Sequence, residues 1–537
     1  MTAPLLRIEG LDLSIGQNLI LDDVGLSVRE AEIHGIVGES GSGKSLTALT
    51  VMRLLPQGSR GNGILEFNGR DLLAATEPEM CRLRGRDIGM VFQEPMTALN
   101  PVKTIGQQIA EGLIWHLRIS RAEAEQRTLA LLDRVGLDPA KISPNRFPHQ
   151  LSGGQRQRVV IAIAIALNPR LIIADEPTTA LDVTIQAQIL ELLKGIVAEH
   201  NSALILISHD LAVVADMADH VTIMRHGTVV EAGETKKLFR TLAHPYSKML
   251  IEASTHQPNR TPHAVSGEPL LQVRDLVRTY PLPRPHTFAK REIFTAVDGV
   301  SFEIHRGESL GLVGESGCGK STLARTILAL DAPQSGSVTL DGEDVFGLDD
   351  ARLAEQRGKM SVVFQDPYGS FNPRHKVKRL VAEPLHLLPP MGASEVRDRV
   401  SKVLTDVGLT TADMDKYPHE FSGGQRQRLA VARALITEPA LVVADEPVSA
   451  LDVSIRAQIL DLFADLQARL GLAMLFISHD LTVVRAITDR VMIMKAGRII
   501  EEGDTESVFE APSEAYTREL LAAVPSFTFS ANSKRAG

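Results

Sequence analysis

The chain has 537 residues, of which 44% are hydrophobic and 23% charged, and its formal net charge at pH 7 is −9. This composition is typical of a globular protein large enough for about three to four domains, and its acidic balance gives no electrostatic reason to expect a nucleic-acid partner. The two cysteines, Cys81 and Cys318, lie far apart in the chain, which argues against a disulfide framework and against a cysteine-held metal centre.

The beginning of the chain, MTAPLLRIEGLDLSI, lacks the basic start and apolar core of a signal peptide. The longest apolar run, VVIAIAIAL at 159–167, is about half the length needed to span a bilayer, and its composition predicts a buried core helix. We therefore expect a chain that does not cross a membrane itself, although it can dock on a protein that does.

A long internal repeat organises the chain. Lys44 recurs as Lys320, an offset of 276 residues, whereas the VFQ motif recurs at an offset of 272 and the motifs after it at 270. The drift indicates small length differences between two copies of one unit, mostly early in each unit, so the chain is a tandem duplication. The other repeated motifs are VFQEPMTALNP (91–101) and VFQDPYGSFNP (363–373), SGGQRQR (152–158 and 422–428), ADEPTTALDV (174–183) and ADEPVSALDV (444–453), and ISHDL (207–211 and 477–481).

The composition between the repeats predicts the domain boundaries. We expect a first domain at 1–252, a second domain at 270–528 and a polar linker rich in Pro, Ser and Thr at 253–269. The last residues, 529–537, are expected to be disordered. Within each domain, short apolar runs such as IHGIVG and LIIAD alternate with longer stretches of helical spacing, which predicts an α/β fold with a mostly parallel sheet.

The first chemical motif is VGESGSGKS at 37–45, which returns as VGESGCGKS at 313–321. Each copy follows an apolar run and opens a helical one, as a phosphate-binding loop requires. Its glycines let backbone N–H groups turn toward phosphates, its lysine reaches the terminal phosphates, and its serine hydroxyl can bind Mg²⁺. A glycine-rich turn without function does not account for two copies in matched context. The expected phosphate-binding residues are Gly38, Ser40, Gly41, Gly43, Lys44 and Ser45, and Gly314, Ser316, Gly317, Gly319, Lys320 and Ser321.

Two apolar runs, LIIADE at 171–176 and LVVADE at 441–446, end in paired carboxylates. Asp175 and Asp445 suit Mg²⁺, and Glu176 and Glu446 suit a general base that orients or deprotonates water. For one strand end alone, the alternative interpretation is that the acidic residues only cap a loop. Beside two phosphate loops, the catalytic interpretation is favoured.

Together with these motifs, LSGGQ (151–155), FSGGQ (421–425) and ISHD resemble the ATP-binding-cassette (ABC) ATPases, twice and over nearly the whole chain. The resemblance implies two tandem P-loop NTPase domains, each with a mainly parallel sheet, a helical subdomain and a short C-terminal extension. It also implies ATP and Mg²⁺ as ligands, in a head-to-tail sandwich where each phosphate loop faces the signature of the other domain. The signature residues are Ser152, Gly153, Gly154 and Gln155, and Ser422, Gly423, Gly424 and Gln425.

Other positions take their expected roles from the same resemblance. Gln93 and Gln365 match the loop that touches Mg²⁺ and senses the membrane partner. His209 and His479 match the switch histidine that contacts the γ-phosphate and holds the catalytic glutamate. A further pair, Asp182 and Asp452, matches the loop that couples the two sites.

The two halves depart from the family pattern in different ways. Tyr280 fits the aromatic residue that stacks on adenine, but Ile15 takes that position in the first half, which predicts weaker adenine binding there. The ARAL after the signature is kept at 432–435 but reads AIAI at 162–165, so the contacts of one arginine are expected to be missing. Cys318 replaces Ser42 in the second loop, either as a tolerated small residue or as a thiol activated by the helix N-terminus.

The stretches LDVTIQAQILELL and HPYSKMLIEA (244–253) closely resemble the ATPases of oligopeptide, dipeptide and nickel importers, and YTRELLAAVP at 516–525 ends the second half similarly. The chain looks like a fused form, similar to the microcin C and peptide importer type. This implies two integral-membrane permease subunits, an extracytoplasmic substrate-binding protein, and a peripheral location on the cytoplasmic face of the inner (plasma) membrane. Some relatives hold an iron–sulfur cluster in the extension; this one has no cysteine there, so none is expected.

Peptide is the expected cargo, with glutathione, a peptide antibiotic or nickel left open. The main alternative is a tandem-cassette ATPase that acts on ribosomes. Such proteins carry a long charged helix pair between cassettes and typically SGGE, whereas this linker is short and uncharged and both signatures read SGGQRQR.

Overall fold

The computed structural model describes residues 3–179, 181–260, 267–282, 284, 291–366, 369–449 and 451–525. The chain divides into two compact units, and the main part of the first ends at Thr255, where His256 begins the second. This division falls inside the segment predicted to be a linker. Residues 261–266 of that segment, and the predicted tail at 529–537, lie outside the described residues.

The core of the first unit is a six-stranded sheet in the order β10-β9-β3-β8-β7-β6. Strands β9, β3, β8, β7 and β6 pair in parallel, and β10 pairs antiparallel with β9. Strands β3, β7 and β8 are buried along their whole length, as predicted for strands covered on both faces. The strands are β3 (Ile33–Val37), β6 (Ile88–Val91), β7 (Leu171–Asp175), β8 (Ala203–Ser208), β9 (His220–Arg225) and β10 (Thr228–Glu234).

A smaller antiparallel sheet, in the order β2-β1-β4-β5, completes the strands of this unit. Its inward residues join those of the core sheet and of α1 in one apolar cluster that includes Leu13, Ile36 and Val51. The strands are β1 (Leu6–Ile15), β2 (Asn18–Val28), β4 (Ser59–Phe67) and β5 (Arg70–Asp71).

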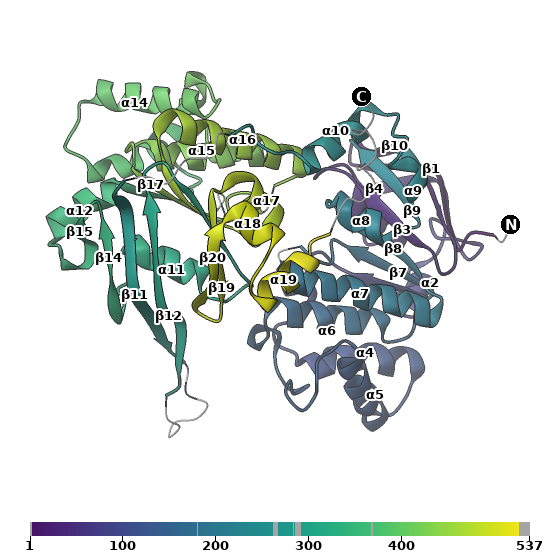
Figure 1. Ribbon diagram of the computed structural model, residues 1–537. Coiled ribbons are helices and arrows are strands. Elements are labelled where there is room, and N and C mark those ends of the chain that lie inside the picture. Colours follow the sequence, from purple (N-terminus) through teal and green to yellow (C-terminus); the bar gives the residue numbers. More distant parts are fainter. Residues whose placement is uncertain are drawn as a thin grey trace. The chain divides into compact units, whose positions relative to one another are not determined.

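The helices of the first unit include a helical subdomain, in which α4, α5 and α6 pack against one another (Figure 1) and share an apolar cluster with the core sheet. The apolar run at 159–167 lies mostly in α6 and is largely buried, which confirms the predicted core helix. The helices are α1 (Lys44–Met52), α2 (Glu77–Leu83), α3 (Pro95–Ala98), α4 (Ile105–Leu117), α5 (Arg121–Arg134), η1 (Pro148–Gln150), α6 (Gly153–Ile165), α7 (Val183–His200), α8 (Leu211–Met217), α9 (Thr235–Leu238) and α10 (Pro245–Ser254).

The second unit repeats this architecture, with sheet orders β16-β17-β18-β13-β19-β20 and β12-β11-β14-β15. The two matched sheets confirm the predicted α/β duplication. The strands are β11 (Pro269–Pro281), β12 (Ile293–His305), β13 (Ser309–Val313), β14 (Ser335–Leu340), β15 (Glu343–Asp344), β16 (Met360–Val363), β17 (Leu441–Asp445), β18 (Ala473–Ile477), β19 (Arg490–Lys495) and β20 (Arg498–Asp504). The helices are α11 (Lys320–Ile327), η2 (Val345–Gly347), α12 (Asp350–Gly358), α13 (Val377–Ala382), η3 (Glu383–Leu387), α14 (Ala393–Asp406), η4 (Thr411–Asp415), η5 (Pro418–Glu420), α15 (Gly423–Leu435), α16 (Val453–Leu470), α17 (Leu481–Ile487), α18 (Thr505–Glu510) and α19 (Ala515–Ala522).

The two units differ in two local ways. Strands β1 and β2 join through the turn between Ile15 and Asn18, whereas β11 ends at Pro281 and β12 begins only at Ile293. This longer connection explains a length difference early in the unit. In the helical subdomain, the long helix α4 is replaced by α13 followed by a 3-10 segment that contains Pro384, because proline cannot donate the backbone hydrogen bond that would continue a helix.

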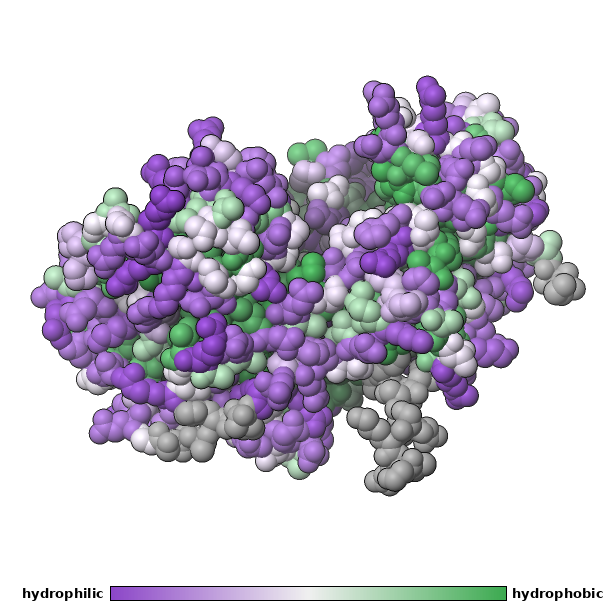
Figure 2. Space-filling view, turned by 90° about the horizontal axis from the view of Figure 1, so that it is seen from above, coloured by the Kyte–Doolittle hydropathy of each residue, from purple (hydrophilic) through white to green (hydrophobic). Residues whose placement is uncertain are grey.

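Polar residues cover most of the face drawn in Figure 2, and apolar residues lie between them in separate groups.

Several large apolar side chains of the first unit are exposed in the segment that follows Gln93. They include Met96 at 58%, Val102 at 80% and Trp115 at 59%. Among the helices that the structure describes, none combines the length and the apolar character that a membrane span requires.

Candidate nucleotide site

Each phosphate loop connects the end of a buried core strand to the first turn of a helix. In the first unit the loop runs from β3 to α1, and Gly43 caps the helix with φ of 101°, a conformation that favours glycine. A Cβ at Gly38 would lie 2.3 Å from the backbone oxygen of Met224. Both glycines are therefore required by the backbone, which keeps the loop tight against β9.

The loop lysines are buried and fold back across their own loops. Lys44 is 5% exposed, and its Nζ donates to the carbonyl oxygens of Gly38 at 2.8 Å and Glu39 at 2.9 Å. In the second unit, Nζ of Lys320 donates to the carbonyl oxygens of Gly314 at 2.6 Å and Glu315 at 2.9 Å. A buried ammonium group beside a helix N-terminus suits a phosphate chain, because both attract negative charge.

The serine after each lysine reaches the aspartate at the end of another core strand, β7 in the first unit and β17 in the second. The hydroxyl of Ser45 donates to Oδ1 of Asp175 at 3.0 Å. Burial is the largest influence on Asp175 and raises its pKa to about 6, and burial also raises the pKa of Asp445. A hydroxyl and a buried carboxylate that converge in this way are the oxygen ligands that Mg²⁺ prefers. The residues present therefore fit the expected ion.

Glu176 follows β7 directly, with its backbone in the left-handed region at φ of 45°. Its Oε2 accepts from Nε2 of Gln93 at 3.1 Å and from the hydroxyl of Thr179 at 2.8 Å, and lies 3.2 Å from Nδ1 of His209. Burial acts to raise the pKa of Glu176, but the bond and charge of His209 and the bond from Thr179 outweigh it and lower the pKa to about 2. The carboxylate is therefore ionised at neutral pH.

The second unit builds a similar cluster around Glu446. Nε2 of Gln365 donates to its Oε2 at 2.8 Å, and Nδ1 of His479 lies 3.1 Å from its Oε1. Burial again opposes these partners, yet the pKa of Glu446 is lowered and that of His479 is raised. Ser449 takes the place of Thr179: its hydroxyl donates to the backbone oxygen of Glu446 at 3.2 Å, and its bond to the carboxyl also lowers the pKa of Glu446. The sequence did not single out Thr179 and Ser449, although their equal position in the two repeats was a usable signal.

Both signature motifs form helix N-termini. Ser152 caps α6, its hydroxyl accepts from the backbone N–H of Gln155 at 3.3 Å, and the amide oxygen of Gln155 accepts from the backbone N–H of Ser152 at 3.1 Å. Ser422 and Gln425 repeat this capping box at the start of α15. The two glycines of each signature are thus the first residues of a helix. A helix N-terminus favours a negatively charged group.

Three remaining predicted residues occupy distinct positions. Tyr280 lies on β11, with the guanidinium carbon of Arg278 4.6 Å from its ring centroid and its hydroxyl donating to Asp331 at 3.3 Å. Asp182 precedes α7, is 7% exposed and accepts from the hydroxyl of Thr184 at 2.9 Å. Asp452 caps the N-terminus of α16.

Known protein families match both units. Residues 21–179 and 297–449 each match the ABC transporter family, and residues 230–274 and 500–536 match the C-terminal region of oligopeptide/dipeptide transporters. The chain belongs to the ABC transporter family. It is an ATPase subunit with two cassettes, and the ribosome-acting alternative is not supported.

Two relatives of this ABC ATPase match nearly its whole length. The glutathione import ATP-binding protein GsiA of Salmonella choleraesuis (strain SC-B67) is 44% identical and covers 97% of this chain and 89% of its own. The peptidoglycan transport ATP-binding protein YejF of Agrobacterium fabrum (strain C58 / ATCC 33970) is 43% identical and covers 97% of this chain and 96% of its own.

The two cassettes of the ABC ATPase differ at the position of the arginine in ARAL. Arg433 donates to the backbone oxygen of Ser370 at 2.7 Å and lies over the ring of Phe371. In the first cassette Ile163 takes this position and packs against the apolar cluster that contains Leu99. Apolar packing thus replaces the arginine contacts.

Cys318 is only 7% exposed, and burial raises the pKa of its thiol above the usual range. A raised pKa lowers the fraction of reactive thiolate. The structure thus favours Cys318 as a small buried residue of the ABC ATPase loop rather than as an activated thiol.

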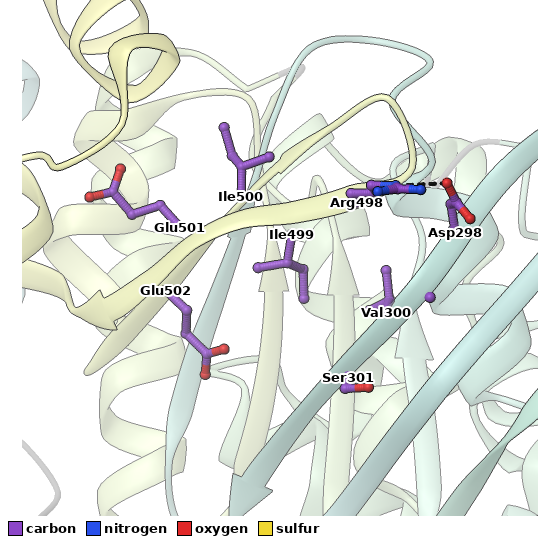
Figure 3. A pocket seen from close by; sticks show the side chains of 9 residues that line it. Asp298, Val300, Ser301, Arg498, Ile499, Ile500, Glu501 and Glu502 are labelled. Carbon is purple, nitrogen blue, oxygen red and sulfur yellow. Dashed lines mark hydrogen bonds and ion pairs between the residues drawn. The ribbon is translucent and has the colours of Figure 1, made fainter.

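A pocket of about 600 Å³ lies outside the nucleotide loops, between β12 and β20 of the second cassette (Figure 3). Nε of Arg498 donates to Oδ2 of Asp298 at 2.7 Å at one end, and Glu501 lies at the opposite end in the same view. This pocket holds none of the residues predicted to bind nucleotide.

Proposed function

We propose that this ABC ATPase powers the import of short peptides or peptide-like compounds through separate permease subunits. The observation that carries the proposal is the presence of two full sets of motif residues, each followed by a C-terminal region of the oligopeptide/dipeptide transporter type. The relatives named for glutathione and peptidoglycan transport support cargo of peptide chemistry.

Within each site, the proposed roles follow from the charges and bonds of the side chains. Lys44 and Lys320 bind the terminal phosphates of ATP, and the ionised carboxylates of Glu176 and Glu446 orient or deprotonate the attacking water. Mg²⁺, when bound, neutralises charge on the phosphates. The residues proposed to hold it are Ser45, Gln93 and Asp175 in the first site and Ser321, Gln365 and Asp445 in the second.

The two cassettes are proposed to close head to tail around two ATP molecules. The loop at 38–45 would then face Ser422–Gln425, and the loop at 314–321 would face Ser152–Gln155. The position of both signatures at the N-termini of α6 and α15 supports this arrangement, because a helix N-terminus favours a phosphate group. His209 and His479, each within hydrogen-bonding reach of a glutamate, are proposed to sense the γ-phosphate.

The proposed partners are two integral-membrane permeases and, through them, an extracytoplasmic binding protein, with the ATPase on the cytoplasmic face of the inner membrane. Exposed apolar side chains after Gln93 support a docking surface there, since such groups mark interaction sites. Val102 is 80% exposed and Trp115 59%.

The test is a pull-down of the tagged full chain from detergent-solubilised membranes, with partners identified by mass spectrometry. Two polytopic permeases are expected, and Val102→Asp with Trp115→Asp should reduce their recovery. Leu129→Asp on α5, where the leucine is 41% exposed, is the matched control and should leave recovery unchanged. Recovery of ribosomes without a permease would overturn the importer proposal.

A further inference from the structure

The C-terminal extension of each cassette buries one tyrosine against the phosphate loop of the same cassette. Tyr246, at the start of α10, is 3% exposed, and its hydroxyl oxygen accepts from the backbone N–H of Glu39 at 3.2 Å. The same hydroxyl donates to Oε2 of Glu39 at 3.4 Å. The tyrosine and this loop residue are 207 positions apart, so the contact is purely tertiary.

The second cassette repeats the contact with a different extension sequence. Tyr516, at the start of α19, is 5% exposed, and its hydroxyl oxygen accepts from the backbone N–H of Glu315 at 3.3 Å. The helices read PYSKMLIEAS and AYTRELLA, and they share the tyrosine, a buried hydroxyl residue (Ser247 and Thr517) and a buried leucine (Leu250 and Leu520). Among these shared residues, the tyrosine is the one whose side chain bonds to the phosphate loop in both copies.

Each tyrosine is held in place by the strand at the edge of the core sheet. Glu231 on β10 accepts from the backbone N–H groups of Ala243 at 2.8 Å and His244 at 3.3 Å, just before α10 begins. On the other side, the guanidinium carbon of Arg225 lies 4.8 Å from the ring centroid of Tyr246.

In the second cassette, Glu501 on β20 accepts from the backbone N–H groups of Ser513 at 2.7 Å and Glu514 at 3.3 Å. Nζ of Lys495 lies 4.1 Å from the ring centroid of Tyr516. In both cassettes the glutamate therefore holds the backbone at the start of the helix and the cation lies over the ring, which together position the hydroxyl.

The residue that the tyrosine holds is in turn bonded to the loop lysine. The carbonyl oxygen of Glu39 accepts from Nζ of Lys44 at 2.9 Å, and that of Glu315 accepts from Nζ of Lys320 at the same distance. A hydrogen-bonded path thus runs from the extension through the backbone N–H and carbonyl groups of Glu39, or of Glu315 in the second cassette, to the loop lysine.

We propose that Tyr246 and Tyr516 are positioning residues, which hold the start of each phosphate loop in its nucleotide-binding conformation and so couple the C-terminal extension to ATP binding. The proposal concerns nucleotide affinity and does not depend on the imported compound. By reciprocity, nucleotide that binds better to the held loop must also stabilise the extension.

The test uses the full chain and a fluorescent ADP analogue. Tyr246→Phe keeps the ring but leaves the N–H of Glu39 without this acceptor, and Tyr516→Phe does the same to Glu315. Each variant should weaken one of the two sites by roughly twofold to tenfold, as expected for one neutral hydrogen bond. Because the loop is held equally in the ground and transition states, KM for ATP should rise while kcat changes little.

Tyr417→Phe is the matched control, since its ring stacks on His419 and, in the part of the chain that the structure describes, its hydroxyl makes no hydrogen bond to a phosphate loop. This variant should bind nucleotide like the unaltered protein. A second readout is amide hydrogen exchange: nucleotide should slow exchange in α10 and α19, and this protection should be lost at the helix whose tyrosine is replaced.

Unchanged affinity in both phenylalanine variants, accompanied only by a lower Tm, would overturn the proposal and make the tyrosines simple packing residues. That result would leave the importer proposal intact. Conversely, failure to recover permeases would not alter the expected change in affinity.

Discussion

Gln93 donates from Nε2 to Oε2 of Glu176 at 3.1 Å, and Gln365 makes the same bond to Glu446 at 2.8 Å. The two members of each pair lie on segments that follow adjacent parallel strands, β6 and β7 in the first cassette and β16 and β17 in the second. The residue proposed to sense the permease thus touches the residue proposed to activate water. A shift of the glutamine segment would directly change the bonding of the carboxylate that is proposed to activate water.

Replacing both glutamates, as Glu176→Gln with Glu446→Gln, should lower ATP turnover by roughly 10²–10⁴-fold, since a general base contributes about that much. Nucleotide binding should survive, because the phosphate loops are unaltered. Steady-state phosphate release and equilibrium nucleotide binding check the two parts. Glu191→Gln, which alters an exposed glutamate on α7, is the control. Hydrolysis at half the normal rate in the double variant would disprove the assigned base.

Ile15→Tyr should strengthen nucleotide binding at the first site. Ile15 ends β1 at the position where β11 carries Tyr280, and an aromatic ring adds a stacking contribution of about 0.5–1.5 kcal/mol, or roughly twofold to tenfold in affinity. Titration with a fluorescent ATP analogue provides the measurement. Tyr280→Ala should have the opposite effect and weaken nucleotide binding at the second site. If Ile15→Tyr leaves the affinity of the first site unchanged, the proposed adenine contact is wrong.

Cys318 should react slowly with N-ethylmaleimide, both with and without ATP. The thiol is buried and its raised pKa keeps it protonated, whereas Cys81 is half-buried and should react first. Mass spectrometry of labelled peptides gives the two rates. Cys318→Ser, which restores the residue found at Ser42, should retain ATPase activity. Fast labelling that ATP prevents would establish the opposite, a reactive thiol.

A buried carboxylate in the first cassette should make stability depend on pH. Glu32 is 8% exposed, accepts from the backbone N–H of Arg29 at 3.0 Å, and lies 3.1 Å from Nδ1 of His220 and 3.5 Å from Nδ1 of His34. Burial acts to raise the pKa of Glu32, but these partners outweigh it and lower the pKa below its ordinary 4.5. Its stabilisation is therefore present above about pH 4.5 and is lost as pH falls through the lower, folded-state pKa.

Glu32→Gln should lower the free energy of unfolding of the first cassette by about 1–3 kcal/mol at pH 7, the cost of a buried hydrogen-bonding group that loses a charged partner. The difference should shrink as pH falls below 4.5. Urea unfolding at pH 7 and pH 4 measures both values. Glu30→Gln, at an exposed glutamate nearby, should change neither. A difference that grows on acidification would mean that folding raises the pKa of Glu32 instead of lowering it.

Much of the fold and of the site was predictable, because the decisive signals are local. A phosphate loop needs a strand, a glycine-rich turn and a helix within a dozen or so residues, so the contiguous stretch around Lys44 carries its own geometry. Buried parallel strands read as apolar runs, and both SGGQ motifs read as helix starts. The repetition of every motif then determined, from the sequence alone, that there are two units of one kind with two sets of site residues.

Contacts between distant segments were decided only by the tertiary structure. The bond of Tyr246 to Glu39 joins residues 207 positions apart, and His34 meets Thr222 across 188 positions. Such partners depend on which strands lie side by side, because side chains from β3 and β9 meet only once the sheet has formed. The spacing of motifs along the chain does not predict which strands become neighbours. The sequence by itself determined the chemistry at each position, while packing alone decided how the C-terminal extension reaches the phosphate loop.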